Sequence, residues 1–385
     1  MRNRQYLIPW LAAGLSLAAC GASGAEQAEA ARAAYAAMDY PAARDRLAEA
    51  LADAPGDPEL LLLLARTRLE LGDGEGVIGT LDRLAAIDSL PPDAALLYAE
   101  AELQRGEIAK GLARIEDDSS ADGWRLRAWA AMQQGDRSGA AQAFTSGLAA
   151  PGPKARFNSD YAIFLVDDGR IAEARAAADE ARAEAPDLVQ PLIADGLVAQ
   201  AEQRGEAALA AYNAILERMP HHPVALRGAI DVLGQAGRID ELTPLVERGR
   251  QARPGDPEFI FLAARIAAEG GDWAQARDIL QAGEGAIADH LNARGLYAQA
   301  MLETGQREDA LRRLIVLHRQ MPEHDELRRL YARALGEVGD WAEARRIIHP
   351  LAERENARPE DLAFDRRAAQ GAGDNGPAAV GAAGA

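Results

Sequence analysis

Small and apolar residues recur at fixed distances from a glycine along most of this chain. Residues 271–277 read Gly-Asp-Trp-Ala-Gln-Ala-Arg, and residues 339–345 read Gly-Asp-Trp-Ala-Glu-Ala-Arg. A looser copy begins midway between them at Gly305, so the three copies share one period of about 34 residues. A fixed period of this length is typical of stacked helical repeats. The pattern therefore predicts a turn between two helices that returns along the chain.

The turn can be followed back to Met38, which takes the place of the glycine in the first copy. The later copies turn at Gly72, Gly106, Gly135, Gly169, Gly205, Gly237, Gly271, Gly305 and Gly339. Six of the nine intervals equal the period, whereas the interval that ends at Gly135 is shorter and the two that meet at Gly205 are uneven. Alanine is common seven residues before the turn and five after it, where a small side chain lets paired antiparallel helices approach closely. Proline often follows seventeen residues after the turn and would end the second helix.

This helix–turn–helix unit resembles the tetratricopeptide repeat (TPR) over about residues 25–358. The resemblance implies an all-α fold, a right-handed α-solenoid of about ten repeats in which each repeat buries its apolar face against its neighbours. The unit near residues 107–135 is shorter than the rest, and residues 117–120 read as a loop. We expect residues 359–369 to form a C-terminal capping helix in which Leu362 and Phe364 cover the last repeat. The Gly- and Ala-rich residues 370–385 are expected to be a disordered tail.

The first residues indicate export. Basic residues precede a mostly apolar run over residues 6–17, which is too short to span a bilayer as a helix. The run ends in Leu-Ala-Ala before Cys20, which resembles the lipobox of bacterial lipoproteins. The resemblance implies a signal peptide over residues 1–19, lipid (palmitate included) on Cys20, and a short tether over residues 20–24. The alternative is an ordinary secreted protein with a stray cysteine near its cleavage site. Because Gly21 stands where inner-membrane retention uses Asp, the expected location is the outer membrane, facing the periplasm, with the inner membrane as the alternative.

The chain is strongly acidic. It carries 42 basic and 60 acidic residues, a formal net charge of −18, and loss of the two arginines of the leader makes this −20. Such a surface repels nucleic acid and anionic lipid, so we expect no nucleic-acid partner.

A stacked array of this kind offers a long concave surface. In the tetratricopeptide family, first-helix residues thirteen, ten, six and three places before the turn line that groove. The resemblance therefore implies a partner-binding groove formed by Arg66, Glu100, Arg125, Trp129, Arg227, Asp231, Phe261, Arg265, Asn292, Gln299, Arg329 and Arg333.

The arginines of this groove would suit an acidic peptide or an anionic glycan, or each would instead pair with a neighbouring glutamate. Trp129 beside Arg125 is the strongest candidate for a binding hot spot, because aromatic and arginine anchors dominate binding energy. The alternative is that Trp129 only fills space in the shortened repeat.

Several motifs suggest chemistry at first sight, but each has a structural explanation. Residues 72–76 read Gly-Asp-Gly-Glu-Gly, like a phosphate loop, but no strand precedes them and the period places them in a repeat turn. The two histidines at residues 221 and 222 lie in a loop between repeats, and His318, His324 and His349 lack metal-ligand spacing. We find no nucleophile signature. We therefore expect no catalytic residue, no metal site and no cofactor.

These features together predict a non-catalytic protein–protein interaction scaffold, a membrane-anchored TPR lipoprotein of the cell envelope that serves assembly or secretion. The turn at residues 69–73 and the shortened third unit are similar to those of the repeat lipoproteins of exopolysaccharide and exosortase (PEP-CTERM) systems. A role in outer-membrane complex biogenesis is the second scaffold hypothesis. The alternative class is a glycan- or peptidoglycan-binding or -processing accessory protein, or an enzyme whose site is not recognisable in the sequence.

Overall fold

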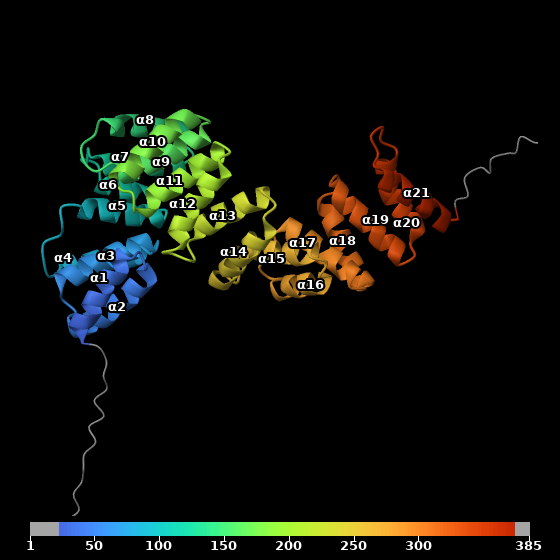
Figure 1. Ribbon diagram of the computed structural model, residues 1–385, viewed down its shortest axis with the longest axis horizontal. Coiled ribbons are helices and arrows are strands. Elements are labelled where there is room, and N and C mark those ends of the chain that lie inside the picture. The colour runs from blue at the N-terminus through green and yellow to red at the C-terminus, as the bar shows by residue number, and fades with distance from the viewer. Residues whose placement is uncertain (1–22, 374–385) are drawn as a thin grey trace, which may run out of the picture. The chain divides into compact units, whose positions relative to one another are not determined.

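The computed structural model describes residues 23–373, which form helices joined by turns and loops, with no strand in that range (Figure 1). The helices are α1 (Gly24–Ala36), α2 (Tyr40–Asp53), α3 (Pro58–Glu70), α4 (Gly74–Ala85), α5 (Ala94–Gln104), α6 (Ile108–Arg114), α7 (Ala121–Gln133), α8 (Arg137–Leu148), α9 (Ala155–Asp167), α10 (Ile171–Glu184), α11 (Val189–Ala201), α12 (Gly205–Leu216), α13 (Pro223–Gln235), α14 (Ile239–Ala252), α15 (Pro257–Glu269), α16 (Trp273–Ala282), α17 (Leu291–Glu303), α18 (Arg307–Gln320), α19 (Asp325–Glu337), α20 (Trp341–Ala352) and α21 (Pro359–Gly371).

The described chain divides into two compact units. Unit 1 comprises residues 23–164 and 183–185 and contains α1 to α8 and most of α9. Unit 2 comprises residues 165–182 and 186–373 and contains most of α10 and all of α11 to α21.

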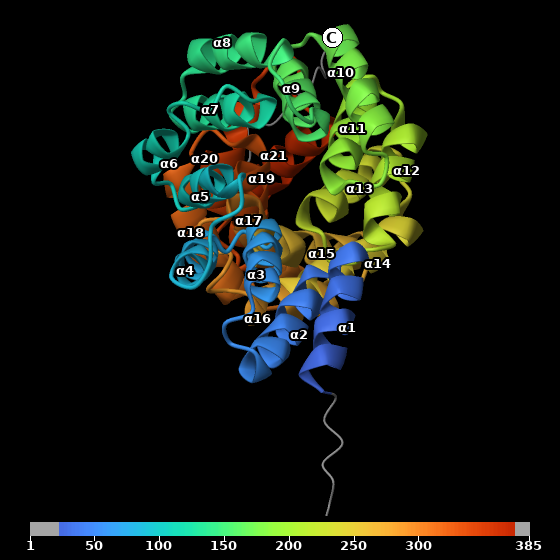
Figure 2. The same ribbon diagram turned by 90° about the vertical axis from the view of Figure 1, so that its left-hand side faces the viewer.

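Each unit is built from helical hairpins. In unit 1, α1 packs with α2, α3 with α4, α5 with α6 and α7 with α8, and each of these hairpins packs on the next (Figure 2). Unit 2 follows the same scheme from α11 with α12 to α19 with α20, and α21 packs on α20. The all-α solenoid of helix–turn–helix repeats that the sequence predicts is therefore confirmed.

A residue in the left-handed backbone region follows the first helix of each repeat. These residues are Met38, Gly72, Gly106, Gly135, Gly169, Gln203, Gly237, Gly271, Gly305, Gly339 and Gly373. They follow one another at the repeat period, except for the shorter step from Gly106 to Gly135. The assignment of one turn to Gly205 was wrong, because φ is +60° at Gln203 and Gly205 is the first residue of α12. With the turn at Gln203, the two uneven intervals that met at Gly205 both become equal to the period.

A Gly-Asp pair ends one helix and begins the next. At Gly72, where φ is +73°, the backbone N–H donates to the carbonyl of Leu69 (3.0 Å). The N–H of Asp73 donates to the carbonyl of Arg68 (2.9 Å), which completes the pair of bonds that closes a helix around a left-handed residue. The carboxylate of Asp73 then accepts from the N–H of Gly76 (2.9 Å) and caps α4. Asp136, Asp272 and Asp340 cap their helices in the same way.

The small residues seven places before each turn lie where the helices approach most closely. The alanines at residues 31, 65, 99, 128, 162, 264, 298 and 332 are all fully buried. In the repeat that turns at Gln203, Gly196 takes this place, and a Cβ there would lie 2.6 Å from the ring of Tyr212. The repeat period therefore reflects the close packing of neighbouring helices as well as the geometry of the turns.

The shortened repeat has a shorter second helix than its neighbours. Helix α6 has 7 residues, and a loop over residues 115–120 follows it, as the sequence predicts. Arg127 of α7 donates to the carbonyls of Ile115 and Asp118 and stacks on the ring of Trp124, 4.6 Å from its centroid. Arg127 thereby satisfies backbone groups that a longer helix would have paired.

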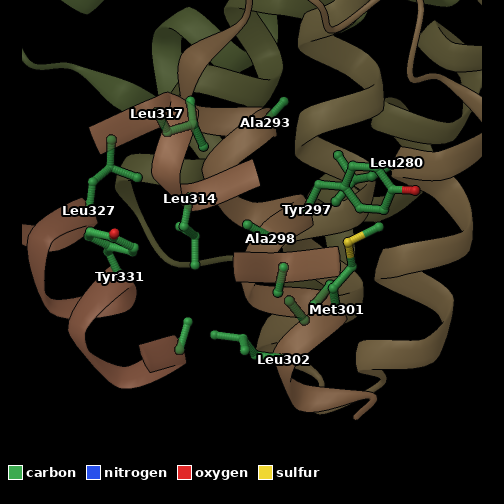
Figure 3. Packing of buried hydrophobic residues seen from close by; sticks show 14 of the residues in the cluster. Leu280, Ala293, Tyr297, Ala298, Met301, Leu302, Leu314, Leu317, Leu327 and Tyr331 are labelled. Carbon is green, nitrogen blue, oxygen red and sulfur yellow. The ribbon is translucent and has the colours of Figure 1, made fainter. Parts of the chain in front are cut away.

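The largest buried cluster of unit 2 lies between its later helices. Tyr297 and Met301 of α17 pack with Leu280 of α16, and Leu314 of α18 packs with Tyr331 of α19 (Figure 3). These side chains are at most 8% exposed. This core holds the first helices α15, α17 and α19 in register, and the candidate site of unit 2 lies on those helices.

The ends of the chain are described only in part. The signal peptide, Cys20 and part of the tether lie outside the described residues, as do residues 374–385 of the expected tail. The helix expected over residues 359–369 is α21, which extends to Gly371. Its covering contacts differ from the prediction, since Leu362 is 42% exposed while Asp361 is buried. Phe364 does pack on the last repeat, with its ring 6.4 Å from that of Trp341.

Candidate functional site

The twelve expected groove residues all lie on first helices of repeats. Arg66, Glu100, Arg125 and Trp129 belong to α3, α5 and α7 of unit 1. The other eight belong to α13, α15, α17 and α19 of unit 2. The two sets have very different surroundings.

In unit 1 the inner face is filled by charged side chains. Arg125 is buried, and its guanidinium donates to Glu100 (2.7 Å), Asp122 (2.8 Å) and Asp160 (3.4 Å). A small cavity of about 270 Å³ remains beside these groups, lined also by Tyr35, Arg66, Glu70, Asp93 and Arg156. The guanidinium of Arg125 therefore has three carboxylate partners before any external partner arrives.

A second arginine ties helices that are far apart in the sequence. Arg156 of α9 forms an ion pair with Glu70 of α3 and lies 3.6 Å from Glu100 of α5. With Arg125 on α7, the network joins the first helices of four repeats. We name these residues (Glu70, Glu100, Asp122, Arg125, Arg156 and Asp160) the inner network of unit 1.

Two acids of the inner network, Glu100 and Asp160, have pKa values shifted in opposite directions. Burial acts to raise the pKa of Glu100, but Arg125 and Arg156 outweigh it, and the pKa is lowered. Burial raises the pKa of Asp160, and the charge of Arg125 offsets this only in part. Glu100 is thus held as a carboxylate, whereas the ionised form of Asp160 is disfavoured.

The expected hot spot of unit 1 has a structural role in this arrangement. Trp129 is half-buried and packs against a cluster that contains Leu103, Ile115 and Leu126. Arg125 is only 7% exposed and belongs to the inner network. Arg125 therefore pairs with neighbouring acids, and Trp129 fills space in the core. Both placements are the alternatives that the sequence left open.

In unit 2 the structure brings six of the expected residues together. Phe261, Arg265, Asn292, Gln299, Arg329 and Arg333 all line one cavity of about 510 Å³. We call this cavity the groove of unit 2. Helices α15, α17 and α19 contribute its walls, and its lining is mostly apolar because Leu291, Leu296, Met321, Leu327 and Leu330 complete it. The prediction that these residues bind a partner remains a prediction, but they do form one continuous surface.

The arginines of the groove have internal carboxylate partners. Arg329 donates to both oxygens of Asp361 (2.8 Å each) and to Glu326 (2.9 Å). Arg333 donates to Glu303 (2.6 Å) and Glu337 (2.9 Å). Arg265 lies 3.4 Å from Glu269. The expected basic lining is therefore compensated by neighbouring acids, the alternative that the sequence left open.

A second cavity of about 520 Å³ adjoins the groove. Arg329 and Arg333 line both cavities, and Trp341, Phe364 and Arg367 line the second. Sequence reasoning missed the apolar wall, although Leu296 and Leu330 share one repeat position, nine residues before the turn. That periodicity was the available signal. Arg227 and Asp231 on α13 are exposed and do not line either cavity.

The motifs that suggested chemistry have structural roles. Gly72 is a turn residue and Asp73 caps α4, so residues 72–76 belong to a repeat turn. Within residues 23–373, no group of three or more His, Cys, Asp and Glu side chains is arranged to hold a metal ion. In the same range, no helix has the length and apolarity needed to cross a membrane.

Comparison with known proteins agrees with this geometry. Two models of the tetratricopeptide repeat family match residues 34–92 and 125–188. The remaining repeats keep the same helix–turn–helix unit and, apart from the shortened repeat of α5 and α6, the same period. The chain therefore contains tetratricopeptide repeats.

Several solved structures resemble the chain weakly. The tetratricopeptide domain of P58(IPK) is 12% identical over 92% of this chain and 99% of its own, with a TM-score of 0.38. Pseudomonas aeruginosa PilF is 20% identical over 54% of this chain and 96% of its own, with a TM-score of 0.45. YrrB, described as having an unusual peptide-binding site, is 17% identical over 52% of this chain and 94% of its own, with a TM-score of 0.39. No curated protein matches the sequence. Likenesses this weak carry no information on function.

The repeat fold suggests a protein–protein interaction scaffold, because tetratricopeptide domains bind protein or peptide partners and are generally non-catalytic.

Proposed function

We propose that this protein is a non-catalytic scaffold that binds an extended polypeptide segment in the groove of unit 2. The observation that carries the proposal is the joint placement of six expected contact residues around one mostly apolar cavity of about 510 Å³. Concave, mostly apolar cavities with a few polar groups are the usual form of a binding site. The inner face of unit 1 lacks such a surface because the inner network fills it.

The lining indicates how a segment would bind. Phe261, Leu296 and Leu330 offer an apolar surface for a large side chain, while the amides of Asn292 and Gln299 can donate to and accept from its backbone. Since Arg329 and Arg333 already have acid partners, we expect apolar contacts to supply most of the affinity. An acidic side chain of the segment would exchange with those internal partners and set its orientation.

The groove can be tested with two matched variants. Leu296→Asp places a charge in the groove, and Val316→Asp places the same charge on α18, where Val316 is 46% exposed and lies outside the groove. We expect the first variant to weaken partner binding by more than tenfold and the second to leave it unchanged. Equal binding by both variants would contradict the proposal.

We further propose that the scaffold is a lipoprotein of the cell envelope. The leader and the lipobox-like residues before Cys20 support this proposal. It extends to an outer-membrane anchor facing the periplasm and to a role in exopolysaccharide export or outer-membrane complex assembly. The full chain with Cys20→Ser should leave the membrane fraction for the soluble fraction. Retention of that variant in the membrane fraction would contradict the lipid anchor.

A further inference from the structure

Three histidines of unit 2 occupy one repeat position. His222, His290 and His324 each lie fifteen residues before the left-handed turn residue of their repeat. Each is the N-cap of a first helix: α13, α17 and α19 respectively. The recurrence shows that these rings have a shared structural task.

The same atom of each ring performs that task. The Nδ1 atom accepts a hydrogen bond from the backbone N–H three residues later: Ala225 for His222 (3.3 Å), Ala293 for His290 (3.1 Å) and Leu327 for His324 (3.3 Å). Acceptance at Nδ1 requires the neutral ring with its proton on Nε2. These helix starts are therefore capped only while the histidines are neutral.

Other repeats cap the same position with residues that keep their acceptor. Asp57 accepts from two N–H groups at the start of α3, Asp256 caps α15, and Ser120 caps α7. Aspartate and serine still accept hydrogen bonds between pH 5 and 8, whereas histidine titrates with an ordinary pKa of about 6.5. A protonated ring donates from both nitrogens and adds a positive charge at the positive end of the helix dipole.

We propose that these three histidine caps make the starts of α13, α17 and α19 acid-sensitive, so that mild acid loosens the groove. Two of them adjoin that site. His324 lines the groove, and the ring of His290 lies 5.1 Å from that of Phe261, which also lines it. The effect on partner binding rests on the proposed function of the groove, whereas the loosening of the helix starts does not.

The charged groups around each ring leave this outcome unchanged. The Nε2 atom of His290 lies 3.1 Å from Glu258 of α15, a contact that a protonated ring keeps while its Nδ1 still loses the acceptor role. His324 lines the groove together with Arg265 of α15 and with Arg329 and Arg333 of its own helix, and it has Asp325 and Glu326 in the first turn of that helix. For His222, burial lowers the pKa. Its cap therefore contributes stability above the ordinary pKa, and that contribution is lost at a lower pH, as pH falls through the lowered value.

His318 and His349 would not imitate this signal at the starts of α17 and α19. Burial, Arg328 and Arg346 lower the pKa of His318, which lies within α18 and caps no helix. His349 lies within α20, 3.1 Å from Asp365 and 3.2 Å from Glu353, and caps no helix.

Hydrogen exchange of the full chain tests the proposal by mass spectrometry at pH 7.5 and 5.0, with protection corrected for the intrinsic exchange rate. We expect protection at the starts of α17 and α19 to fall about fivefold at the lower pH, as expected for loss of an N-cap. The starts of α3 and α15, capped by aspartate, should not change. The variant His290→Asn/His324→Asn keeps an uncharged acceptor and should abolish the fall, and Asp256→His should create one at α15.

An equal fall at the starts of α15 and α17, or a fall that survives the asparagine variant, would overturn the proposal. Photocrosslinking from Gln299 at both pH values separates the two claims. A crosslink that weakens in acid for the wild type but not for the asparagine variant supports both. Acid-sensitive caps with no crosslink at either pH would refute binding in the groove and leave the caps established.

Discussion

Arg156 of α9 forms an ion pair with Glu70 of α3, a residue 86 positions earlier in the chain. The two helices belong to repeats separated by two others, so the pair closes the inner side of unit 1. The shortened repeat, with its 7-residue α6, lies between them in the sequence. The closed inner network leaves the groove of unit 2 as the better surface for a partner.

The ion pair should show strong energetic coupling. Arg156→Met removes one charge from a partly buried network, and we expect it to lower the free energy of unfolding by about 3 kcal/mol, because Glu70 and Glu100 lose a partner. The double variant Arg156→Met/Glu70→Met should recover part of this loss. Urea unfolding of the four chains in the double-mutant cycle measures the coupling. Strict additivity of the two single effects would show that the pair is not formed.

Two of the three acids that contact Arg125, Glu100 and Asp160, should respond in opposite ways to pH. Because the pKa of Glu100 is lowered, its stabilisation is present above its ordinary pKa and is lost as pH falls through the lowered value. The pKa of Asp160 is raised, so stability increases as pH falls through that raised value. We therefore expect Glu100→Gln to cost about 2–3 kcal/mol at pH 7 and Asp160→Asn to cost under about 1 kcal/mol. Urea midpoints at pH 7 and pH 5 check both; an equal cost for the two variants would refute the distinction.

The sequence predicted the repeat fold because its signals are local. A glycine and two small residues at fixed spacing, followed in several repeats by an aspartate, mark most of the turns and close helix contacts, and these features need no knowledge of distant residues. The one turn that the sequence placed at the wrong residue has a local cause as well. Gln203 adopts a left-handed turn without glycine, and the nearby Gly205 offered a false match.

The turn at Gln203 gives a direct stability prediction. Gln203→Gly relieves the cost of a left-handed backbone with a side chain and should stabilise the protein by about 0.5–1 kcal/mol. Gly205→Ala should be neutral or stabilising, because Gly205 lies in α12 and an added Cβ meets Val232 at an ordinary 3.5 Å. Thermal unfolding of the two variants measures these effects. If Gly205→Ala destabilised the protein, the left-handed turn residue would be Gly205 and not Gln203.

The terminal helix depends on one buried acid. Asp361 of α21 receives both hydrogen bonds of the Arg329 fork, and its side chain is only 3% exposed. Asp361→Ala should loosen α21 by about 2–3 kcal/mol, since it leaves a partly buried guanidinium without that partner. Glu326→Ala removes the exposed partner of the same arginine and should cost less than about 0.5 kcal/mol. Hydrogen exchange over residues 359–371 compares them, and equal protection in the two variants would contradict the role of Asp361.

The site was harder to predict than the fold because charge pairing depends on distant residues. The position of Arg125 on its helix is visible in the sequence, but its partners Glu100 and Asp160 come from neighbouring repeats. For the same reason Arg329 and Arg333 read as a basic lining, although acids of α17, α19 and α21 compensate them. The periodic pattern placed six residues of the groove and could also have shown the apolar wall of Leu296 and Leu330.

The most direct test of the groove is photocrosslinking in living cells, with a photoreactive residue at Gln299 in the groove, at Val316 on α18 or at Trp129 of unit 1. The account predicts a partner adduct at Gln299 that Leu296→Asp removes, with none at Val316 or Trp129. Adducts at Val316 or Trp129 and none at Gln299 would contradict it and place the partner on another face.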